Sequence, residues 1–198
     1  MDPSHLRNLC VFCGSSGGRD PVHLETARSV GRMLAQQGIG VVYGGGRIGM
    51  MGAVAEAALA VGGRVIGIIP EVLMRKEVAF EGLTELRVVR SMHERKQMMA
   101  DAADGFLALP GGFGTFEEFC EILTWAQLGI HAKPCGLLNV AGYYDPLLAM
   151  FDRAMAEGFL RERHRALVLA SADPAVLLES MAGYRASPAE PLLSPENA

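Results

Sequence analysis

Residues 107–127, LALPGGFGTFEEFCEILTWAQ, combine a short apolar run, a glycine-rich turn and a helical pattern. Glycine in a strand-to-helix turn lets the backbone approach a ligand closely, and the N-terminus of a helix favours anions. The stretch therefore predicts a phosphate site. Glu117 and Glu118 fall in the first turn of the expected helix, where they would repel a bound phosphate. We interpret the stretch as an anion site with a second function beside it.

The rest of the chain repeats this alternation of apolar runs and helical patterns. The predicted strands are 8–14, 39–46, 64–70, 85–90, 105–112, 133–139 and 166–171. The predicted helices are 21–37, 50–61, 92–103, 115–128, 144–157 and 174–182, and 70–84 is expected to be a loop. Near-continuous apolar strands separated by helices indicate a parallel sheet covered on both faces. We therefore predict an α/β fold, a doubly wound Rossmann-like sheet that binds ligands at the carboxyl ends of its strands.

The composition suits one domain that binds a small molecule. The chain has 198 residues, of which 50% are hydrophobic. We expect one domain over 1–183 and a flexible, proline-rich tail over 184–198. The net charge of −4 and the lack of a basic cluster argue against a nucleic-acid partner. No apolar run has the length of a membrane span, and the first residues lack a signal-peptide pattern, so we expect a cytoplasmic protein.

Cys10 and Cys13 form a CxxC motif, which elsewhere indicates a zinc or redox site. Here the motif lies inside an apolar run, and residues three apart in a strand point to opposite faces. We therefore expect buried core thiols. The histidines show no ligand spacing, so no metal site is expected.

Three strand ends carry glycine-rich turns, at residues 13–18 (CGSSGG), 43–52 (YGGGRIGMMG) and 110–115 (PGGFGT). Strand ends of a parallel sheet share one edge, so the three turns are expected to lie together.

The middle turn permits an alternative function. Gly44, Gly46 and Gly49 satisfy GxGxxG, and Glu71 follows about 20 residues later, as in dinucleotide-binding proteins. Against this alternative, the turn follows the second strand and a proline precedes the acid. A nicotinamide-dependent oxidoreductase nevertheless remains a candidate.

The acidic residues of the 115–128 helix also have a structural explanation. Thr115 and Glu118 fit a T-x-x-E capping box, which would account for one carboxylate. Glu117 and Glu121 lie one turn apart, as expected either for a solvated helix face or for a site.

The motifs together resemble one family. PGGFGTFEE is similar to the PGGxGTxxE signature of the Lonely-guy family, the cytokinin-activating phosphoribohydrolases. Further similarity lies in VFCGSS, YGGGRIGMMG, SMHERKQMMADAADGFLALPGG and EILTWAQLGIHAKPCGLLNVAGYYDPLL, so the resemblance covers residues 8–178. Phe113 and Phe116 stand where the family commonly has tyrosine and leucine.

The resemblance implies hydrolysis of the N-glycosidic bond of AMP or N6-modified AMP, without a cofactor and in a homodimer. Arg95 matches the essential arginine of the family, and Glu118 matches the last position of the signature, with Glu117 and Glu121 as alternative acids. A carboxylate would stabilise positive charge that develops on the ribose. The residues that the resemblance places at the substrate are Gly14, Ser15, Gly44, Gly45, Gly46, Glu77, Met92, Lys96, Pro110, Gly111, Gly112, Phe113, Gly114, Thr115 and Thr124.

Two other functions would make different demands on these residues. Family members have been labelled lysine decarboxylases, but a pyridoxal enzyme needs a lysine for its Schiff base. The chain has only Lys76, Lys96 and Lys133, none of them in a pattern typical of pyridoxal attachment. A nucleotide carrier or sensor without catalysis would use the same glycine turns, although it would not need acids at the sugar.

Overall fold

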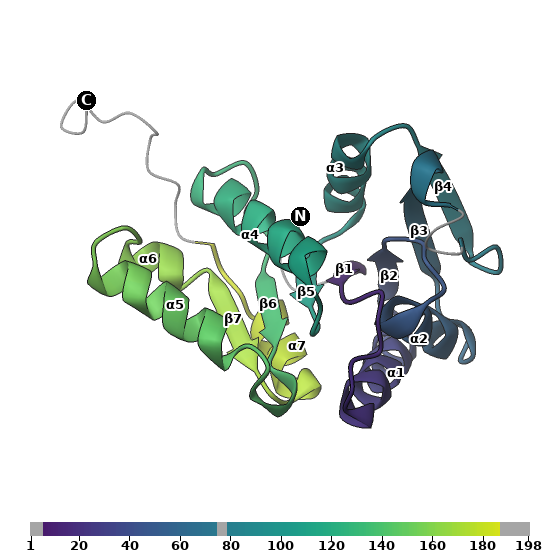
Figure 1. The fold of residues 1–198 in the computed structure, drawn as a ribbon, viewed down its shortest axis with the longest axis horizontal. Helices are drawn as coiled ribbons and strands as arrows, with labels where there is room; N and C mark the ends of the chain where they lie inside the picture. Colours follow the sequence, from purple (N-terminus) through teal and green to yellow (C-terminus); the bar gives the residue numbers. More distant parts are fainter. Residues whose placement is uncertain (1–5, 75–78, 187–198) are drawn as a thin grey trace.

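The computed structural model describes residues 6–74 and 79–186, which form one α/β domain (Figure 1). Its strands are β1 (Asn8–Phe12), β2 (Gly40–Tyr43), β3 (Val65–Pro70), β4 (Glu85–Val89), β5 (Gly105–Ala108), β6 (Cys135–Leu138) and β7 (Val168–Ser171). Its α-helices are α1 (Pro21–Gln36), α2 (Gly49–Leu59), α3 (Met92–Ala102), α4 (Phe113–Gln127), α5 (Asp145–Ala156), α6 (Glu162–Arg165) and α7 (Pro174–Ala182). Two short 3-10 helices are η1 (Glu71–Leu73) and η2 (Val140–Gly142). The predicted Rossmann-like fold is confirmed.

The sheet is parallel throughout, in the order β4-β3-β2-β1-β5-β6-β7. The chain winds from β1 outward to β4, and α3 then returns it to the middle of the sheet, where β5 pairs with β1. Strand order therefore reverses between β1 and β5. Ligand sites of doubly wound folds lie at such a reversal, outside the carboxyl ends of the strands.

Each face of the sheet has its own hydrophobic core, because successive side chains of a strand point to opposite faces. Leu9 and Val11 pack with α1, α2 and α7, whereas Cys10 and Phe12 pack with α3, α4 and α5. Cys13 lies in the first of these cores, so the thiols of the CxxC motif are on opposite faces. All four cysteines are free, and Cys10 and Cys13 are buried, as predicted.

Two predicted features near the central turn are wrong in detail. Strand β5 ends at Ala108, because the following glycines form a turn. Helix α4 begins at Phe113 with Gly112 as its N-cap, and no side chain caps it. The Phe116 N–H donates to the Gly112 carbonyl at 3.1 Å, so the helix starts two residues before Thr115. The predicted capping box is therefore absent, and Thr115 instead lies in the first turn of α4 with its side chain buried, 4% exposed.

Three short helices and the C-terminal residues lie outside the predicted pattern of strands and helices. Helix α6 and the two 3-10 helices were not predicted, because segments of three or four residues show no apolar period. Residues 184–186 have no regular secondary structure, and the remainder of the predicted tail lies outside the described residues. Within the described parts of the chain, none of the helices is both long and apolar enough to cross a membrane.

Candidate functional site

A cavity of about 320 Å³ opens at the carboxyl ends of β1, β2 and β5, between α3 and the start of α4. This is the reversal point of the strand order, where the fold predicts a ligand. Its described lining residues are Val11, Phe12, Cys13, Gly14, Ser15, Gly44, Met51, Leu73, Met92, Arg95, Met99, Gly112, Phe113, Gly114, Thr115, Glu117 and Glu118. Eleven of these were predicted site residues, and the others are mostly apolar.

The three glycine-rich turns meet at this cavity, as the fold predicted. The Gly14 N–H donates to the Pro110 carbonyl at 3.0 Å, and the Met50 N–H donates to the Gly14 carbonyl at 3.1 Å. A Cβ at Gly49 would lie 2.3 Å from the backbone carbon of Ser15, and Gly49 has φ +60°. Only glycine permits both this approach and this conformation. The turns thus brace one another by backbone contacts.

The start of α4 forms one wall of the cavity. Gly112, Gly114 and Thr115 lie in its first turn, where backbone N–H groups have no partner within the helix. A Cβ at Gly111 would lie 2.1 Å from Thr115 Oγ1, so glycine is needed for this packing. Phe113 is 92% exposed. The wall is suited to an anion through N–H groups and the helix dipole.

Arg95 is a buried cation on the opposite wall. Its side chain comes from α3, and the residue is only 4% exposed. The Nε–H donates to the Ile68 carbonyl at 3.1 Å, and Nη2 donates to the Gly44 carbonyl at 3.0 Å. Nη1 lies 3.8 Å from the sulfur of Met92. Backbone groups of β3 and of the turn after β2 therefore fix the plane of the guanidinium at the cavity.

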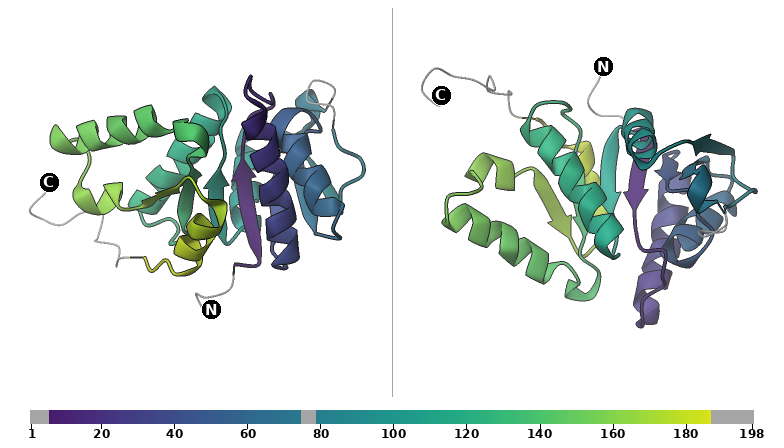
Figure 2. Two further views of the ribbon diagram at one scale, coloured as in Figure 1. Left: turned by 90° about the horizontal axis from the view of Figure 1, so that it is seen from below. Right: turned by 45° about the horizontal axis from the view of Figure 1, so that its top comes forward.

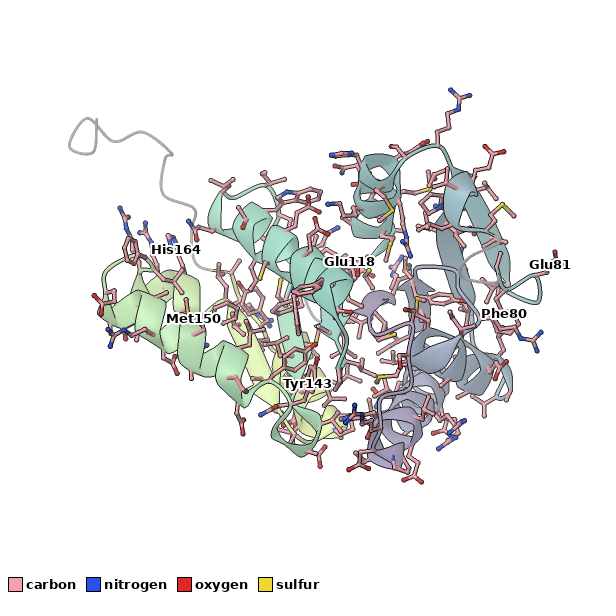
Figure 3. All side chains as sticks on the ribbon, viewed as in Figure 1. Phe80, Glu81, Glu118, Tyr143, Met150 and His164 are labelled. Carbon is pink, nitrogen blue, oxygen red and sulfur yellow. The ribbon has the colours of Figure 1, made fainter. Side chains whose placement is uncertain are left out.

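Glu118 is half-buried on α4, on the side that faces α3 (Figure 3). Its charge affects two cysteines at and near the end of β1. Burial raises the pKa of the Cys13 thiol, and the nearby charge of Glu118 raises it further. Burial raises the pKa of the Cys10 thiol as well, again with Glu118 adding to the effect. With the capping box absent, the position of Glu118 beside the cavity has no capping explanation.

Lys96 binds the two remaining acids. Its Nζ donates to Glu117 Oε1 at 2.5 Å and to Glu121 Oε1 at 2.9 Å, which joins α3 to α4. Burial lowers the pKa of Lys96, but the hydrogen bonds that it donates to both carboxylates outweigh this effect and raise the pKa. We name this group the Lys96 clasp. Glu117 and Glu121 are therefore engaged in an ion-pair network, and a freely solvated helix face does not describe them.

Several predicted residues are not among the described residues that line this cavity: Gly45, Gly46, Lys96, Pro110, Gly111, Glu121 and Thr124. Gly45 has φ +77° and packs against Ile69, so its role in the turn is conformational. The Thr124 hydroxyl donates to the Cys120 carbonyl on its own helix. Glu77 lies outside the described residues.

Two groups of lining residues were not predicted. Val11, Phe12 and Cys13 lie at the end of β1, and Met51, Leu73 and Met99 line the cavity from α2, η1 and α3. The sequence could have indicated the strand-end residues, because any residue at the carboxyl end of a strand in this fold is a candidate for lining the ligand site. Met99 could not be identified, since a methionine in a helix is usually a core residue.

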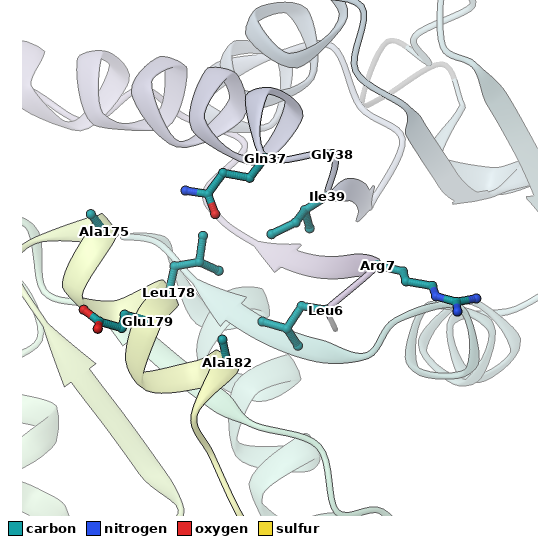
Figure 4. A pocket seen from close by; sticks show the side chains of 9 residues that line it. All are labelled: Leu6, Arg7, Gln37, Gly38, Ile39, Ala175, Leu178, Glu179 and Ala182. Atoms are coloured by element: carbon teal, nitrogen blue, oxygen red, sulfur yellow. The ribbon is translucent and has the colours of Figure 1, made fainter. Parts of the chain in front are cut away.

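Two other cavities have different surroundings. One of about 420 Å³ lies behind the glycine turns, and its lining includes Ser16, Arg19, His23 and Tyr143. Another, of about 450 Å³, lies at the amino ends of β1 and β2, where Leu6, Ile39 and Leu178 enclose it (Figure 4). Doubly wound folds bind ligands at the carboxyl ends of the strands, which excludes the 450 Å³ cavity. The 420 Å³ cavity shares Gly14, Ser15 and Gly112 with the 320 Å³ cavity. Of these two, the 320 Å³ cavity is the one lined by Arg95 and Glu118, so it is the candidate site.

Comparison with solved structures supports the fold. The molybdenum cofactor carrier protein MCP from Chlamydomonas reinhardtii has a TM-score of 0.67 at 19% identity, over 91% of this chain and 100% of that chain. The molybdenum cofactor binding protein from the phototrophic bacterium Rippkaea orientalis has a TM-score of 0.66 at 21% identity, over 88% of this chain and 94% of that chain. At these identities the likeness concerns the fold alone.

Sequence comparison goes further. A family model described as "Possible lysine decarboxylase" matches residues 51–181. The chain is 52% identical to the probable cytokinin riboside 5'-monophosphate phosphoribohydrolase LOGL9 of Oryza sativa subsp. japonica, over 91% of this chain and 80% of that protein. It is 46% identical to the cytokinin riboside 5'-monophosphate phosphoribohydrolase LOG7 of Arabidopsis thaliana, over 91% of this chain and 83% of that protein. Because these matches extend over most of its length, the chain belongs to the Lonely-guy (LOG) family.

Proposed function

We propose that this protein hydrolyses the N-glycosidic bond of a nucleoside 5′-monophosphate and releases the free base and ribose 5-phosphate. The curated relatives are named for this reaction on cytokinin riboside 5'-monophosphates. We propose AMP bearing an N6 substituent as the substrate. One observation carries the proposal: a helix N-terminus suited to phosphate, a buried guanidinium and a half-buried carboxylate line the same cavity.

The phosphate is proposed to bind at the start of α4. The N–H groups of Gly112, Gly114 and Thr115 would donate to its oxygens, with the helix dipole adding to the attraction. Gly14 and Ser15 lie on the same cavity wall and would contact the same group. Binding the phosphate here places the ribose over the first turns of α4, beside Glu118. The cavity volume lies within the usual range of about 300–1,000 Å³ for small-molecule sites.

The reaction is proposed to develop positive charge on the ribose. The bond from C1′ to the base nitrogen breaks, and its electron pair leaves with the base. Glu118 stabilises the oxocarbenium-like ribose and accepts a proton from the water that adds to C1′. The base nitrogen takes up a proton from solvent. The Arg95 guanidinium, held by two backbone carbonyls, would present a fixed fork to ribose or phosphate oxygens.

Lysine decarboxylation is not favoured by the lysines present. The Nζ of Lys96 binds two glutamates, and the Nζ of Lys133 donates to the Ala100 carbonyl at 2.8 Å. A pyridoxal enzyme needs a lysine amine available to the cofactor. Lys76 lies outside the described residues.

The test is release of base from N6-isopentenyl-AMP and from AMP, with ribose 5-phosphate measured in the same samples. We expect release from both, faster from the modified nucleotide. Glu118→Gln should lower kcat by about 10²–10³-fold, as loss of a transition-state charge contact does. Glu157→Gln, on the surface at the end of α5, is the matched control and should retain full activity.

Other outcomes separate the alternatives. Binding of AMP without release of base would replace the hydrolase with a nucleotide carrier. Full activity of Glu118→Gln would move the proposed acid to Glu117 or Glu121. Tight binding of NAD or NADP in a fluorescence titration would favour the oxidoreductase.

We also propose that the protein is a homodimer. Large apolar side chains are exposed around α5, with Met150 62% exposed (Figure 3) and Phe159 89% exposed. Exposed apolar groups of this kind are often contact sites. Sedimentation velocity should give a dimer, and Met150→Glu together with Phe159→Ser should weaken it. A monomer at all concentrations would contradict this proposal.

A cytoplasmic location is proposed from the thiols. All four cysteines are free, which suits a reducing compartment. Fractionation of the source cells with an antibody to the protein would test this.

A further inference from the structure

The turn after β2 contains three successive glycines, and two of them, Gly44 and Gly45, require glycine for different reasons. Gly45 has φ +77°, a conformation that L-residues rarely adopt, so its backbone requires glycine. Gly44 is not among the described glycines with positive φ. Its backbone would accept any residue, so the need for glycine at this position must come from the space around it.

That space is occupied by one group, the guanidinium of Arg95. A Cβ at Gly44 would lie 2.0 Å from Arg95 Nη2 and 3.1 Å from Arg95 Cζ. The third neighbour, the sulfur of Met51, would be at 3.4 Å, an ordinary contact. Among the described residues, therefore, only Arg95 conflicts with a side chain at position 44.

The same two residues are joined by a hydrogen bond. Arg95 Nη2 donates to the Gly44 carbonyl at 3.0 Å, while Nε donates to the Ile68 carbonyl at 3.1 Å. The guanidinium reaches both carbonyls because nothing projects from Gly44. The guanidinium is also the far end of a flexible side chain, so an added methyl group would displace it and leave the sheet in place.

We propose that Gly44 is a positioning residue for Arg95. By lacking a side chain, it lets the guanidinium occupy its place on the cavity wall. This inference rests on the proposed function, in which Arg95 acts on the nucleotide. It replaces the sequence-based expectation that Gly44 itself contacts the substrate, and it gives the first glycine of the GxGxxG-like turn a role unrelated to a dinucleotide.

A double-mutant cycle tests the inference. Gly44→Ala should lower kcat/KM by about 100-fold, since a small misplacement of a positioned group has effects of that size. In the Arg95→Ala background, Gly44→Ala should have no further effect, because the conflicting atoms are gone. Gly183→Ala is the matched control, since its Cβ would meet its first neighbour only at 3.4 Å. That control should retain wild-type activity.

A second readout needs no substrate. In protein labelled with ¹⁵N-arginine, Arg95→Ala identifies the Nε–H signal of Arg95. That signal should shift or broaden in Gly44→Ala and stay unchanged in Gly183→Ala, with the same circular dichroism spectrum in all three proteins.

The outcomes separate the two proposals. Wild-type kcat/KM in Gly44→Ala, an equal loss in both backgrounds, or an unchanged Nε–H signal would each overturn the positioning role. If the wild type releases no base from any nucleotide, the proposed function fails, and the Nε–H signal still decides whether Gly44 positions Arg95.

Discussion

The two faces of the sheet are covered by helices in different ways. On one face α1 and α2 lie side by side in backbone contact (Figure 2), and a Cβ at Gly31 would lie 2.2 Å from the Val54 carbonyl oxygen. Helix α2 buries eight of its eleven residues. On the other face α3 buries three of its eleven residues, one of them Arg95. Its link to α4 includes the Lys96 clasp.

This difference explains where the site lies. Helices in backbone contact leave no space for a ligand between them, and their packing contributes stability. Helices α3 and α4 leave the ends of β1, β2 and β5 open to a cavity. Substitutions on the first face should therefore change stability, and substitutions on the second should change activity.

Arg95→Lys should have the largest effect, and it tests whether the face covered by α3 and α4 determines activity. Lysine keeps the charge but cannot donate to two carbonyls and a ligand in a fixed plane. We expect kcat/KM to fall by about 10²–10³-fold. The free energy of unfolding should fall by only about 1–3 kcal/mol, because a buried carbonyl loses its donor. Arg28→Lys, exposed on α1, is the control. Activity within fivefold of wild type would show that charge alone suffices.

Gly31→Ala tests the face that α1 and α2 cover, where we expect a loss of stability without a loss of activity. The added methyl group would press α1 against the backbone of α2 at Val54, and overpacking of this kind costs about 3 kcal/mol. Urea unfolding should show this loss, while kcat of the folded protein stays at the wild-type value. A loss of stability below about 0.5 kcal/mol would mean that the helices can move apart freely.

Lys96→Met should have an intermediate effect, because it removes the clasp. Glu117 lines the cavity, and without Lys96 its negative charge would oppose the phosphate. We expect KM to rise about tenfold, equivalent to about 1.4 kcal/mol, with a smaller change in kcat. Adding Glu117→Gln should restore part of the affinity. No restoration would instead favour direct contact between Lys96 and the substrate.

The smallest predicted effect concerns His131, below α4. Its Nε2 lies 2.9 Å from the Ile122 carbonyl, and its Nδ1 accepts from the Lys133 N–H at 3.1 Å, an arrangement that fits the neutral ring. Burial lowers the pKa of His131, and the charge of Lys133 lowers it further, against the effect of the Ile122 hydrogen bond.

The sign follows from proton binding. In the unfolded chain, the His131 imidazole binds a proton below about pH 6.5. In the folded protein its pKa is lower, so the ring is still largely neutral just below that pH. The contribution of His131 to the free energy of unfolding should therefore be complete above that pH and should decrease as the pH falls below it. His131→Gln should show a flatter dependence between pH 7 and 5.5 in urea titrations. Equal slopes for both proteins would contradict this assignment.

The sequence predicted the fold because apolar runs and helical periods alternate clearly along the chain. It also predicted that the glycine turns would meet, since parallel strand ends share an edge. It placed Arg95 and Glu118 at the site only through family resemblance. Taken alone, MHERKQMM has the pattern of a polar surface helix, and the burial of Arg95 depends on one carbonyl from β3 and one from the turn after β2.

One error and one open alternative have the same physical origin. The capping box predicted at Thr115 is wrong, and the solvated face was one of two interpretations of Glu117 and Glu121; both were inferred from local spacing. Tertiary contacts decided both: Thr115 packs against Gly111, and Lys96 from α3 binds the two acids. Pairing between helices α3 and α4 leaves no signal in a single sequence.

Because thiols are buried on both sides of the sheet, their reactivity toward a thiol reagent measures how much of the protein is unfolded. Cys10, Cys13 and Cys135 are buried in the cores, and only Cys120 is exposed. Burial and the charge of Glu117 raise the pKa of Cys120, so even this thiol should react slowly. A thiol reagent should modify one cysteine in the native protein and the other three only on unfolding. Cys13 also lines the cavity, so a nucleotide that binds the folded protein there should slow the modification of this thiol by making unfolding rarer.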